Sequence, residues 1–189
     1  MGIDHLNLKP VVAACAVIIA LCGAARADEA RAPDESALLS ALSRATPAEA
    51  ARIDRELQAL WSKSGSDAMD LLLKRGREAL ERGDPQAAIE HLTALTDHAP
   101  DFAEAWHLRA SAWFELGRYG LAAEDLGRAL TLNPNNYNAL FGLASVLESI
   151  GDDEKAYEAY LRVKAIHPNF EEVSKALERL RPRVTGKTL

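Results

Sequence analysis

Apolar residues recur along most of the chain with the spacing of one helix face, and the same pattern returns every 34 residues. Prolines, glycines and alanines mark this period: Pro100, Pro134 and Pro168; Gly83, Gly117 and Gly151; Ala88, Ala122 and Ala156. A strict repeat of this length predicts stacked helical units that bury their apolar faces against one another. No segment alternates with a period of two over a useful length, so we expect no sheet.

Each repeat carries the signals of two helices. The repeats occupy residues 69–102, 103–136 and 137–170. The first helix should end at Gly83, Gly117 or Gly151, because glycine adopts the left-handed C-cap conformation without a Cβ clash. The second should begin directly afterwards, as Asp84 and Pro85 indicate with a cap and a first-turn proline. Gly120 and Gly127 interrupt the second helix of the middle repeat, which we expect to fray most easily.

Helical signals also flank the repeats. Residues 28–68 predict a short linker and a hairpin of two helices, the second of which opens with a capping box at 46–49. Residues 171–189 predict one capping helix, from Glu171 to Leu180, and a basic tail that we expect to be solvated. A helix at this place would cover the apolar flank that a last repeat leaves open, and Pro182 should end it.

The first 27 residues have the pattern of a signal peptide. An apolar run over 10–25 leads into the small-x-small sequence Ala-Arg-Ala at 25–27, and acidic residues follow it. The run is short for a membrane span, which needs about 20 apolar residues. We therefore expect cleavage after Ala27 and a periplasmic protein. The alternatives are an uncleaved N-terminal anchor and lipidation at Cys15 or Cys22.

Loss of this segment changes the chemistry open to the chain. Both cysteines lie in it, so the mature chain has no thiol for a disulfide, a nucleophile or a metal site. The full chain has 22 basic and 28 acidic residues, of which Lys9, Arg26 and Asp4 are removed, so the mature net charge is −7. Such an acidic chain lacks the basic surface of a nucleic-acid-binding protein. We expect membrane association only if the signal is uncleaved or lipidated.

The repeats resemble tetratricopeptide repeats (TPRs) over residues 69–170. That family places large apolar, small and proline residues at fixed positions of its 34. The middle repeat supplies Trp106, Ala110, Trp113, Ala122, Leu126, Ala129 and Pro134; the third supplies Leu140, Leu143, Ala144, Leu147, Ala156, Tyr160, Val163 and Pro168; the first, more weakly, Leu72, Gly76, Ala88, Leu92 and Pro100. The resemblance implies an all-α fold, a right-handed α-solenoid of three TPR helix pairs.

Two arginines depart from the family pattern, and three tryptophans suggest a ligand site. Arg75 and Arg109 stand where leucine is usual, and we expect their stems to cover apolar surface while their charged heads stay in water. Trp61, Trp106 and Trp113 suggest an aromatic ligand box. Because Trp106 and Trp113 fall on core positions of the repeat, we expect them to pack in the core instead.

The resemblance implies a binding groove on the concave side, which the first helices line. Its expected residues form a mildly apolar surface with acidic edges: Leu73, Arg77, His107, Ser111, Phe114, Phe141 and Ser145. Such a groove suits an amphipathic helix or an extended peptide with apolar anchors and basic flanks. Phe114 and Phe141 are the expected anchors, and we expect both to be removable without loss of stability. The alternative is that these residues are only solvated surface.

One well-known TPR ligand is not expected. The clamp that binds chaperone tails in this family needs lysine, asparagine and arginine at particular first-helix positions. Those positions hold Leu73, Arg77, Leu108, Asn138 and Gly142. We therefore expect a protein or peptide partner of a different kind.

No catalytic constellation emerges from the mature sequence. Its four histidines form no paired ligand set, and it has neither a phosphate loop nor a nucleophile elbow. The acidic run 152–154 is better explained as a helix start, where carboxylates favour the positive end of the dipole. We expect an interaction adaptor with no cofactor or metal and no enzymatic activity. The alternative is an envelope-anchored component of a larger machine, such as a cytochrome-maturation or outer-membrane assembly complex.

Overall fold

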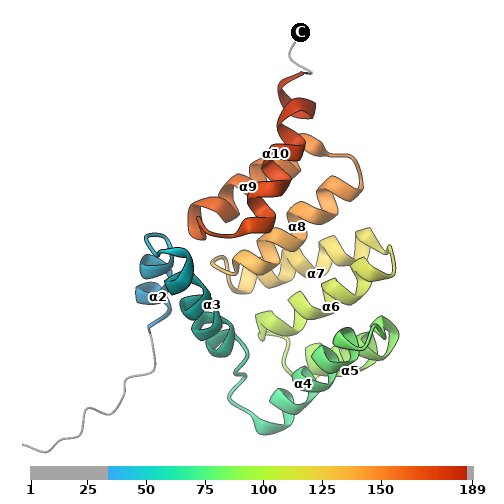
Figure 1. Ribbon diagram of the computed structural model, residues 1–189. Coiled ribbons are helices and arrows are strands. Elements are labelled where there is room, and N and C mark those ends of the chain that lie inside the picture. The colour runs from blue at the N-terminus through green and yellow to red at the C-terminus, as the bar shows by residue number, and fades with distance from the viewer. Residues whose placement is uncertain (1–33, 187–189) are drawn as a thin grey trace, which may run out of the picture. The chain divides into compact units, whose positions relative to one another are not determined.

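The computed structural model describes residues 34–186, and this part of the chain forms nine helices and no strand (Figure 1). In chain order they are α2 (Glu35–Leu42), α3 (Pro47–Trp61), α4 (Asp67–Glu81), α5 (Pro85–His98), α6 (Ala103–Glu115), α7 (Tyr119–Leu132), α8 (Tyr137–Ser149), α9 (Asp153–Ile166) and α10 (Glu171–Thr185). The all-helical prediction is confirmed. The predicted signal peptide, 1–27, lies outside the described residues.

The 34-residue period produces three helix pairs, α4–α5, α6–α7 and α8–α9, and each pair packs on the next (Figure 1). Gly83, Gly117 and Gly151 follow the first helices with φ angles of 72°, 68° and 83°. This left-handed conformation favours glycine and ends each helix as the sequence predicts. Asp84 then caps α5, since its carboxylate accepts the backbone N–H of Ala87 at 3.1 Å.

Small residues set how closely the two helices of a pair approach. Ala88, Ala122 and Ala156 occupy the same place in the three second helices, and all are fully buried. In the first pair, a Cβ added at Gly76 would lie only 2.5 Å from Cγ of Leu92. Any larger side chain at these places would force the helices apart or displace a buried leucine.

The N-terminal hairpin α2–α3 packs against the last repeat, far from it in sequence. Leu42 and Leu57 belong to the same buried apolar cluster as Tyr137 at the start of α8. The Asn169 side chain donates to the Ala45 carbonyl at 2.7 Å. The hairpin, blue to teal in Figure 1, therefore closes on helices that follow it by about a hundred residues.

The capping helix is longer than the sequence predicts. Instead of ending before Pro182, α10 continues to Thr185. Pro182 is exposed, so the backbone hydrogen bond that it cannot make is lost on the solvent side. Arg183 also pairs with Asp153 at the start of α9, at 3.6 Å. Part of the predicted basic tail is therefore helical and attached to the last repeat.

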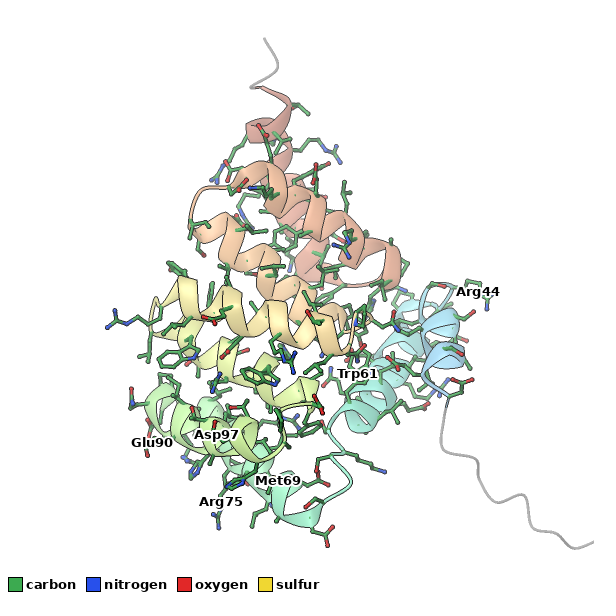
Figure 2. The ribbon with its side chains drawn as sticks, turned by 180° about the vertical axis from the view of Figure 1, so that it is seen from behind. Arg44, Trp61, Met69, Arg75, Glu90 and Asp97 are labelled. Carbon is green, nitrogen blue, oxygen red and sulfur yellow. The ribbon has the colours of Figure 1, made fainter. Side chains whose placement is uncertain are left out.

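The prediction for the two arginines is wrong for Arg109. Its guanidinium binds Asp125 of α7 through two hydrogen bonds of 2.7 and 2.8 Å and lies 4.7 Å from the Trp106 ring, leaving the side chain 15% exposed. Arg75, at the same place in the first repeat, is exposed and points outward (Figure 2). The difference follows from the second helix, because His91 occupies the place of Asp125 in that repeat.

Candidate binding cleft

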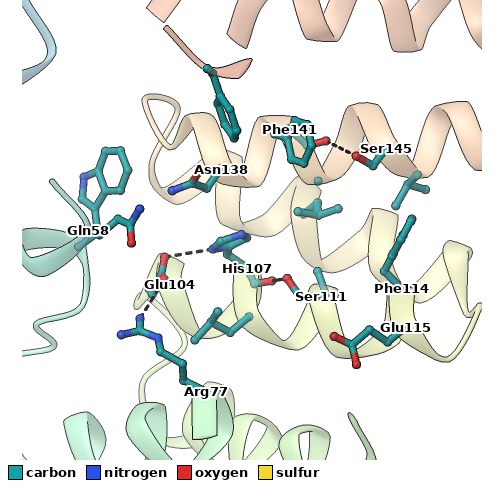
Figure 3. Close-up of a pocket in the computed structure, with 17 residues that line it drawn as sticks. Gln58, Arg77, Glu104, His107, Ser111, Phe114, Glu115, Asn138, Phe141 and Ser145 are labelled. Atoms are coloured by element: carbon teal, nitrogen blue, oxygen red, sulfur yellow. Dashed lines mark hydrogen bonds and ion pairs between the residues drawn. The ribbon is translucent and has the colours of Figure 1, made fainter. Parts of the chain in front are cut away.

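A cleft of about 540 Å³ lies between the hairpin and the first helices of the second and third repeats. Helices α3, α6 and α8 supply its walls, and Phe170 in the loop before α10 adds a ring at its edge (Figure 3). The side chains divide into a polar end near α3 and an aromatic end near the last turn of α6. This division decides what the cleft can bind.

Six of the seven residues predicted for the groove line this cleft: Arg77, His107, Ser111, Phe114, Phe141 and Ser145. The prediction is wrong for Leu73, which is 3% exposed and packs in the apolar cluster of the first repeat. Its cluster includes Ala105 and Leu108 of α6, so α6 covers this position of α4. That the six other residues bind a peptide stays a prediction.

The polar end centres on the carboxylate of Glu104, whose side chain is 11% exposed. Arg77 and Asn136 each donate to it at 3.4 Å, and His107 Nδ1 lies 3.2 Å from it. Arg77 Nη2 also donates to Ser62 Oγ, just after α3, at 3.0 Å. The cleft's one lysine or arginine is therefore already held by an acid and a hydroxyl.

The aromatic end is built from rings that have one face on the core. Phe141 stacks on Phe170, with ring centroids 5.0 Å apart, and tilts against Tyr160 at 5.7 Å. Phe114 packs on Tyr119 at 5.4 Å. Phe114 and Phe141 also join the apolar clusters below them. The expectation that they could be removed at no cost is therefore wrong, because each also packs against the core.

The hairpin supplies two cleft residues that the sequence did not point to, Gln58 and Trp61. The indole of Trp61 packs edge-on to Tyr137 at 5.3 Å and donates to the Glu35 carboxylate at 3.0 Å. Figure 2 shows Trp61 on the side of the hairpin that faces the repeats. The other two tryptophans, Trp106 and Trp113, pack against the repeat cores as predicted.

One tyrosine fixes the hairpin against the third repeat. Tyr137 is fully buried, and its hydroxyl donates to the Asp54 carboxylate in the middle of α3. The pKa of Tyr137 lies far above its usual range, mainly because the ring is buried. The hydrogen bond to Asp54 raises this pKa further. The hydroxyl therefore stays protonated and can donate at any physiological pH.

A buried histidine lies beside this tyrosine. The His167 ring packs edge-on to Tyr137 at 5.3 Å and tilts against Phe170 at 5.4 Å. Its Nδ1 is buried without a hydrogen-bond partner among the described residues. Burial lowers the pKa of His167 more than the nearby Asp54 carboxylate raises it, so the ring is held neutral.

An ion pair lies beside the aromatic end, at a second hollow that Phe114, Phe141 and Ser145 also line. Arg179 of α10 makes two hydrogen bonds of 2.8 and 2.9 Å to Glu148 of α8, and the Tyr160 hydroxyl donates to the same carboxylate at 3.1 Å. The hydrogen bonds from Arg179 are the main reason that the pKa of Glu148 lies below its usual value. Because both charges are satisfied, this pair ties the capping helix α10 to α8.

Residues 34–186 contain neither a cluster of metal ligands nor a helix suited to span a membrane. Among residues 34–186, no group of three or more histidine, cysteine or acidic side chains is placed to hold a metal ion. None of the helices in that range has both the length and the apolar character that crossing a membrane would require. The described site therefore offers apolar contact, hydrogen bonds and one uncompensated acid, Glu115.

A stack of helix pairs with a cleft on its first helices defines an α-solenoid. Two family models, both described as tetratricopeptide repeat, match residues 73–131 and 113–180. A TPR repeat-containing protein of Rhizobium etli is 30% identical over 140 residues, which cover 74% of this chain and 69% of that protein. The chain belongs to the tetratricopeptide repeat family, as the sequence pattern predicts.

Other similar proteins match a shorter part of the chain or share its fold. The human protein SGT1 homolog is 43% identical over 63 residues, which are 33% of this chain but only 17% of that protein. The crystal structure of MamA has a TM-score of 0.59 and 28% identity, covering 71% of this chain and 77% of that one. The first TPR of Spaghetti (RPAP3), bound to the HSP90 peptide SRMEEVD, has a TM-score of 0.60 and 25% identity, covering 62% and 93%.

Proposed function

We propose that this chain is a protein–protein interaction adaptor that binds a peptide segment of its partner in the cleft between α3, α6 and α8. The observation that carries this proposal is the cleft itself, about 540 Å³ in volume and lined by half-buried aromatic rings beside polar side chains. Ligand sites typically have such a volume and such a mixture. The RPAP3 domain bound to a peptide supports the same class of ligand.

The ligand we propose differs from the acidic HSP90 peptide of that relative. Of the positions that would form a carboxylate clamp, Leu73 and Leu108 are buried, and Arg77 is engaged by Glu104. An acidic tail would also meet the carboxylates of Glu104 and Glu115 in the cleft lining. Like charges at close range oppose binding, so an apolar segment with basic neighbours fits better.

We further propose that the protein works in the periplasm after removal of residues 1–27. The apolar run and the Ala-Arg-Ala sequence before Asp28 support this location. The intact mass of the protein purified from its native host tests it, and we expect a chain that starts at Asp28. A mature chain that still carries Met1 would contradict cleavage.

Filling the cleft tests the binding proposal without removing any core side chain. Ser111 lies in the lining, and its hydroxyl only donates to the His107 carbonyl one turn earlier. The variant Ser111→Phe should place a ring in the cleft. The probe is a library of linear heptapeptides displayed on phage and selected on the unmodified protein. We expect the selected peptides to bind Ser111→Phe roughly tenfold more weakly, a loss of about 1.4 kcal/mol.

Thr131→Phe is the matched control. The Thr131 hydroxyl also donates to a carbonyl one turn earlier, that of Gly127, but this side chain is exposed on α7 and outside the cleft. Its variant should bind the selected peptides as the unmodified protein does. If peptides bind both variants equally well, the partner uses another surface and the proposal is wrong.

A further inference from the structure

Two hollows border helix α3 where it meets the third repeat. One is the cleft; the other, of about 390 Å³, lies between α3 and the start of α10 and includes Ala50 and Asp54 in its lining. Gln58, Asn138 and Phe170 line both hollows. Figure 3 shows Gln58 of α3 across from Asn138 of α8. The strip between the hollows is therefore narrow, and a contact made by few residues opens at a lower free-energy cost than a broad one.

The chain between α3 and α4 offers a hinge on the hairpin side. Ser64 belongs with α4, because its backbone N–H and its hydroxyl both donate to Asp70, at 2.8 and 2.6 Å. Ser62 is held to α4 by the hydrogen bond that Arg77 donates at 3.0 Å, and Lys63 is exposed. Rotation at Ser62 and Lys63 would move the hairpin while α4 stays in place, since a few residues absorb the backbone change of a hinge.

The middle of the hairpin is latched by a carboxylate that also bonds to a cleft residue. Asp54 accepts the Tyr137 hydroxyl through one oxygen and the Gln58 carboxamide, at 2.7 Å, through the other. Asp54 and Tyr137 lie outside the cleft lining, whereas Gln58 is part of it. A ligand that contacts Gln58 is therefore one hydrogen bond away from the group that holds the hairpin to the third repeat.

The same contact also carries a cost that opposes closure. His167 lines the hollow beside α3, and its ring packs edge-on to Tyr137 at 5.3 Å. Its Nδ1 is buried without a hydrogen-bond partner among residues 34–186. A buried polar atom of this kind has lost its hydrogen bond to water, and release of the hairpin would open the ring to water again. The closed hairpin is therefore stabilised by the latch and opposed by this histidine.

We propose that the hairpin α2–α3 is a strap that a filled cleft holds closed. In the empty protein the strap opens from the third repeat more often than the repeats open, turning at Ser62 and Lys63, with the Tyr137–Asp54 bond as its latch. Opening carries Gln58 and the neighbouring cleft residue Trp61 away, so the closed strap and the bound ligand favour each other by the same free energy. This inference rests on the proposed function and concerns the regulation of that site.

A single thiol on the covered face of α3 measures the opening. Ala50 is 1% exposed and lies one turn before Asp54, on the same helix face. The variant Ala50→Cys is made in the full chain together with Cys15→Ser and Cys22→Ser, so that iodoacetamide meets one thiol. Its alkylation rate then reports how often the strap is open.

A thiol in the core of the first repeat is the matched control. Ala79 is fully buried, and the other repeats have Trp113 and Leu147 at its place, so Ala79→Cys should fit without strain. We expect Ala50→Cys to be alkylated at least roughly tenfold faster than Ala79→Cys, a difference of about 1.4 kcal/mol in the opening free energy. Circular dichroism of both variants checks that they are folded.

A peptide in the cleft should slow this alkylation. The probe is a synthetic copy of a heptapeptide selected on the unmodified protein, at a concentration of about ten times its Kd. Alkylation of Ala50→Cys should slow roughly tenfold, because a ligand that binds the closed form alone lowers the open population by that factor. In the chain that also carries Ser111→Phe, the same peptide concentration should have little effect.

The latch variant gives a readout outside the cleft lining. Tyr137→Phe, added to Ala50→Cys, should speed alkylation roughly tenfold, a change of about 1.4 kcal/mol. Tyr160→Phe is its control: that hydroxyl also donates to a carboxylate, Glu148 at 3.1 Å, but it joins α9 to α8 and not to the hairpin. It should leave the alkylation rate unchanged.

The outcomes separate the strap from the proposed function. If Ala50→Cys reacts no faster than Ala79→Cys, or if Tyr137→Phe leaves its rate unchanged, the hairpin is no strap and the proposed function stands. A peptide that Ser111→Phe blocks but that slows neither alkylation of Ala50→Cys nor hydrogen exchange in α3 of the unmodified protein would overturn the linkage alone. Failure to select any peptide sensitive to Ser111→Phe would overturn both proposals.

Discussion

The hairpin α2–α3 and the three repeats are all built of paired helices, but they are held in different ways. The repeats share one interface built several times, with Ala88, Ala122 and Ala156 fully buried at the same place. The hairpin depends on contacts that occur once, such as the Tyr137–Asp54 hydrogen bond. A region held by few contacts opens locally at a lower free-energy cost than one held by many. The cleft therefore has one wall that is less stable than the other two.

Loss of a core leucine in a repeat should have the largest effect. Leu92 is fully buried and packs onto Gly76 across the first helix pair. Leu92→Ala should lower the free energy of unfolding by about 2–5 kcal/mol, because it removes apolar contact and leaves a cavity. Urea titration followed by circular dichroism measures this loss. A change below about 1 kcal/mol would mean that the repeats are not the stable part of the comparison.

Removal of the tyrosine hydroxyl should act on the hairpin and spare the repeats. Tyr137→Phe keeps the buried ring but removes one of the two donors to Asp54, leaving only the Gln58 carboxamide at 2.7 Å. We expect the hairpin to be destabilised by about 1.5–3 kcal/mol, the range for a hydrogen bond to a charged group. Hydrogen exchange should accelerate in α3 while α5 and α7 stay protected. Equal acceleration in all three helices would show that the hairpin and the repeats unfold as one unit.

Two glycines of the repeats differ in whether a side chain would fit at their position. A Cβ at Gly127 would meet no atom within 4 Å, so Gly127→Ala should stabilise α7 by about 0.5–1 kcal/mol. A Cβ at Gly76 would lie 2.5 Å from Leu92, so Gly76→Ala should destabilise instead. The melting temperatures of the two variants should move in opposite directions. A shift in the same direction would contradict the packing described for α4 and α5.

Acid should weaken the hairpin side through His167. Its pKa lies below the ordinary value of 6.5 because the ring is buried, so the unfolded chain takes up the proton more readily than the folded one. This contribution to stability is fully present above about pH 6.5, the ordinary pKa of the unfolded chain. It is lost as the pH falls from there through the lower pKa of the folded protein. His167→Gln should flatten the decline in unfolding free energy over that range. An unchanged decline would assign it to other groups.

The sequence predicts the repeats well because each signal occurs three times. Proline, glycine and alanine recur in one register, and the helix ends at Gly83, Gly117 and Gly151 follow from local backbone preference alone. Contacts that occur once are harder to predict. The Tyr137–Asp54 bond joins residues 83 positions apart, and the Arg109–Asp125 pair depends on which residues two neighbouring helices bring together.

The candidate site shows the same division. The repeat register predicts seven groove residues, and six of them line the cleft. The register succeeds here because helix periodicity fixes which positions share a face. Leu73 was misplaced because the register does not show that α6 covers α4 at this point. Gln58 and Trp61 were missed because amphipathic spacing in α3 predicts a buried face but not the surface it packs against.

Hydrogen exchange of the protein with and without a selected linear peptide tests the central claim most directly. If the peptide lies in the cleft between the hairpin and the repeats, it should slow exchange together in the last turns of α3, in α6 and in α8. The exposed faces of α5, α7 and α9 should exchange as before. Protection confined to those second helices, or absent from α3, would contradict a binding site with the hairpin as one of its walls.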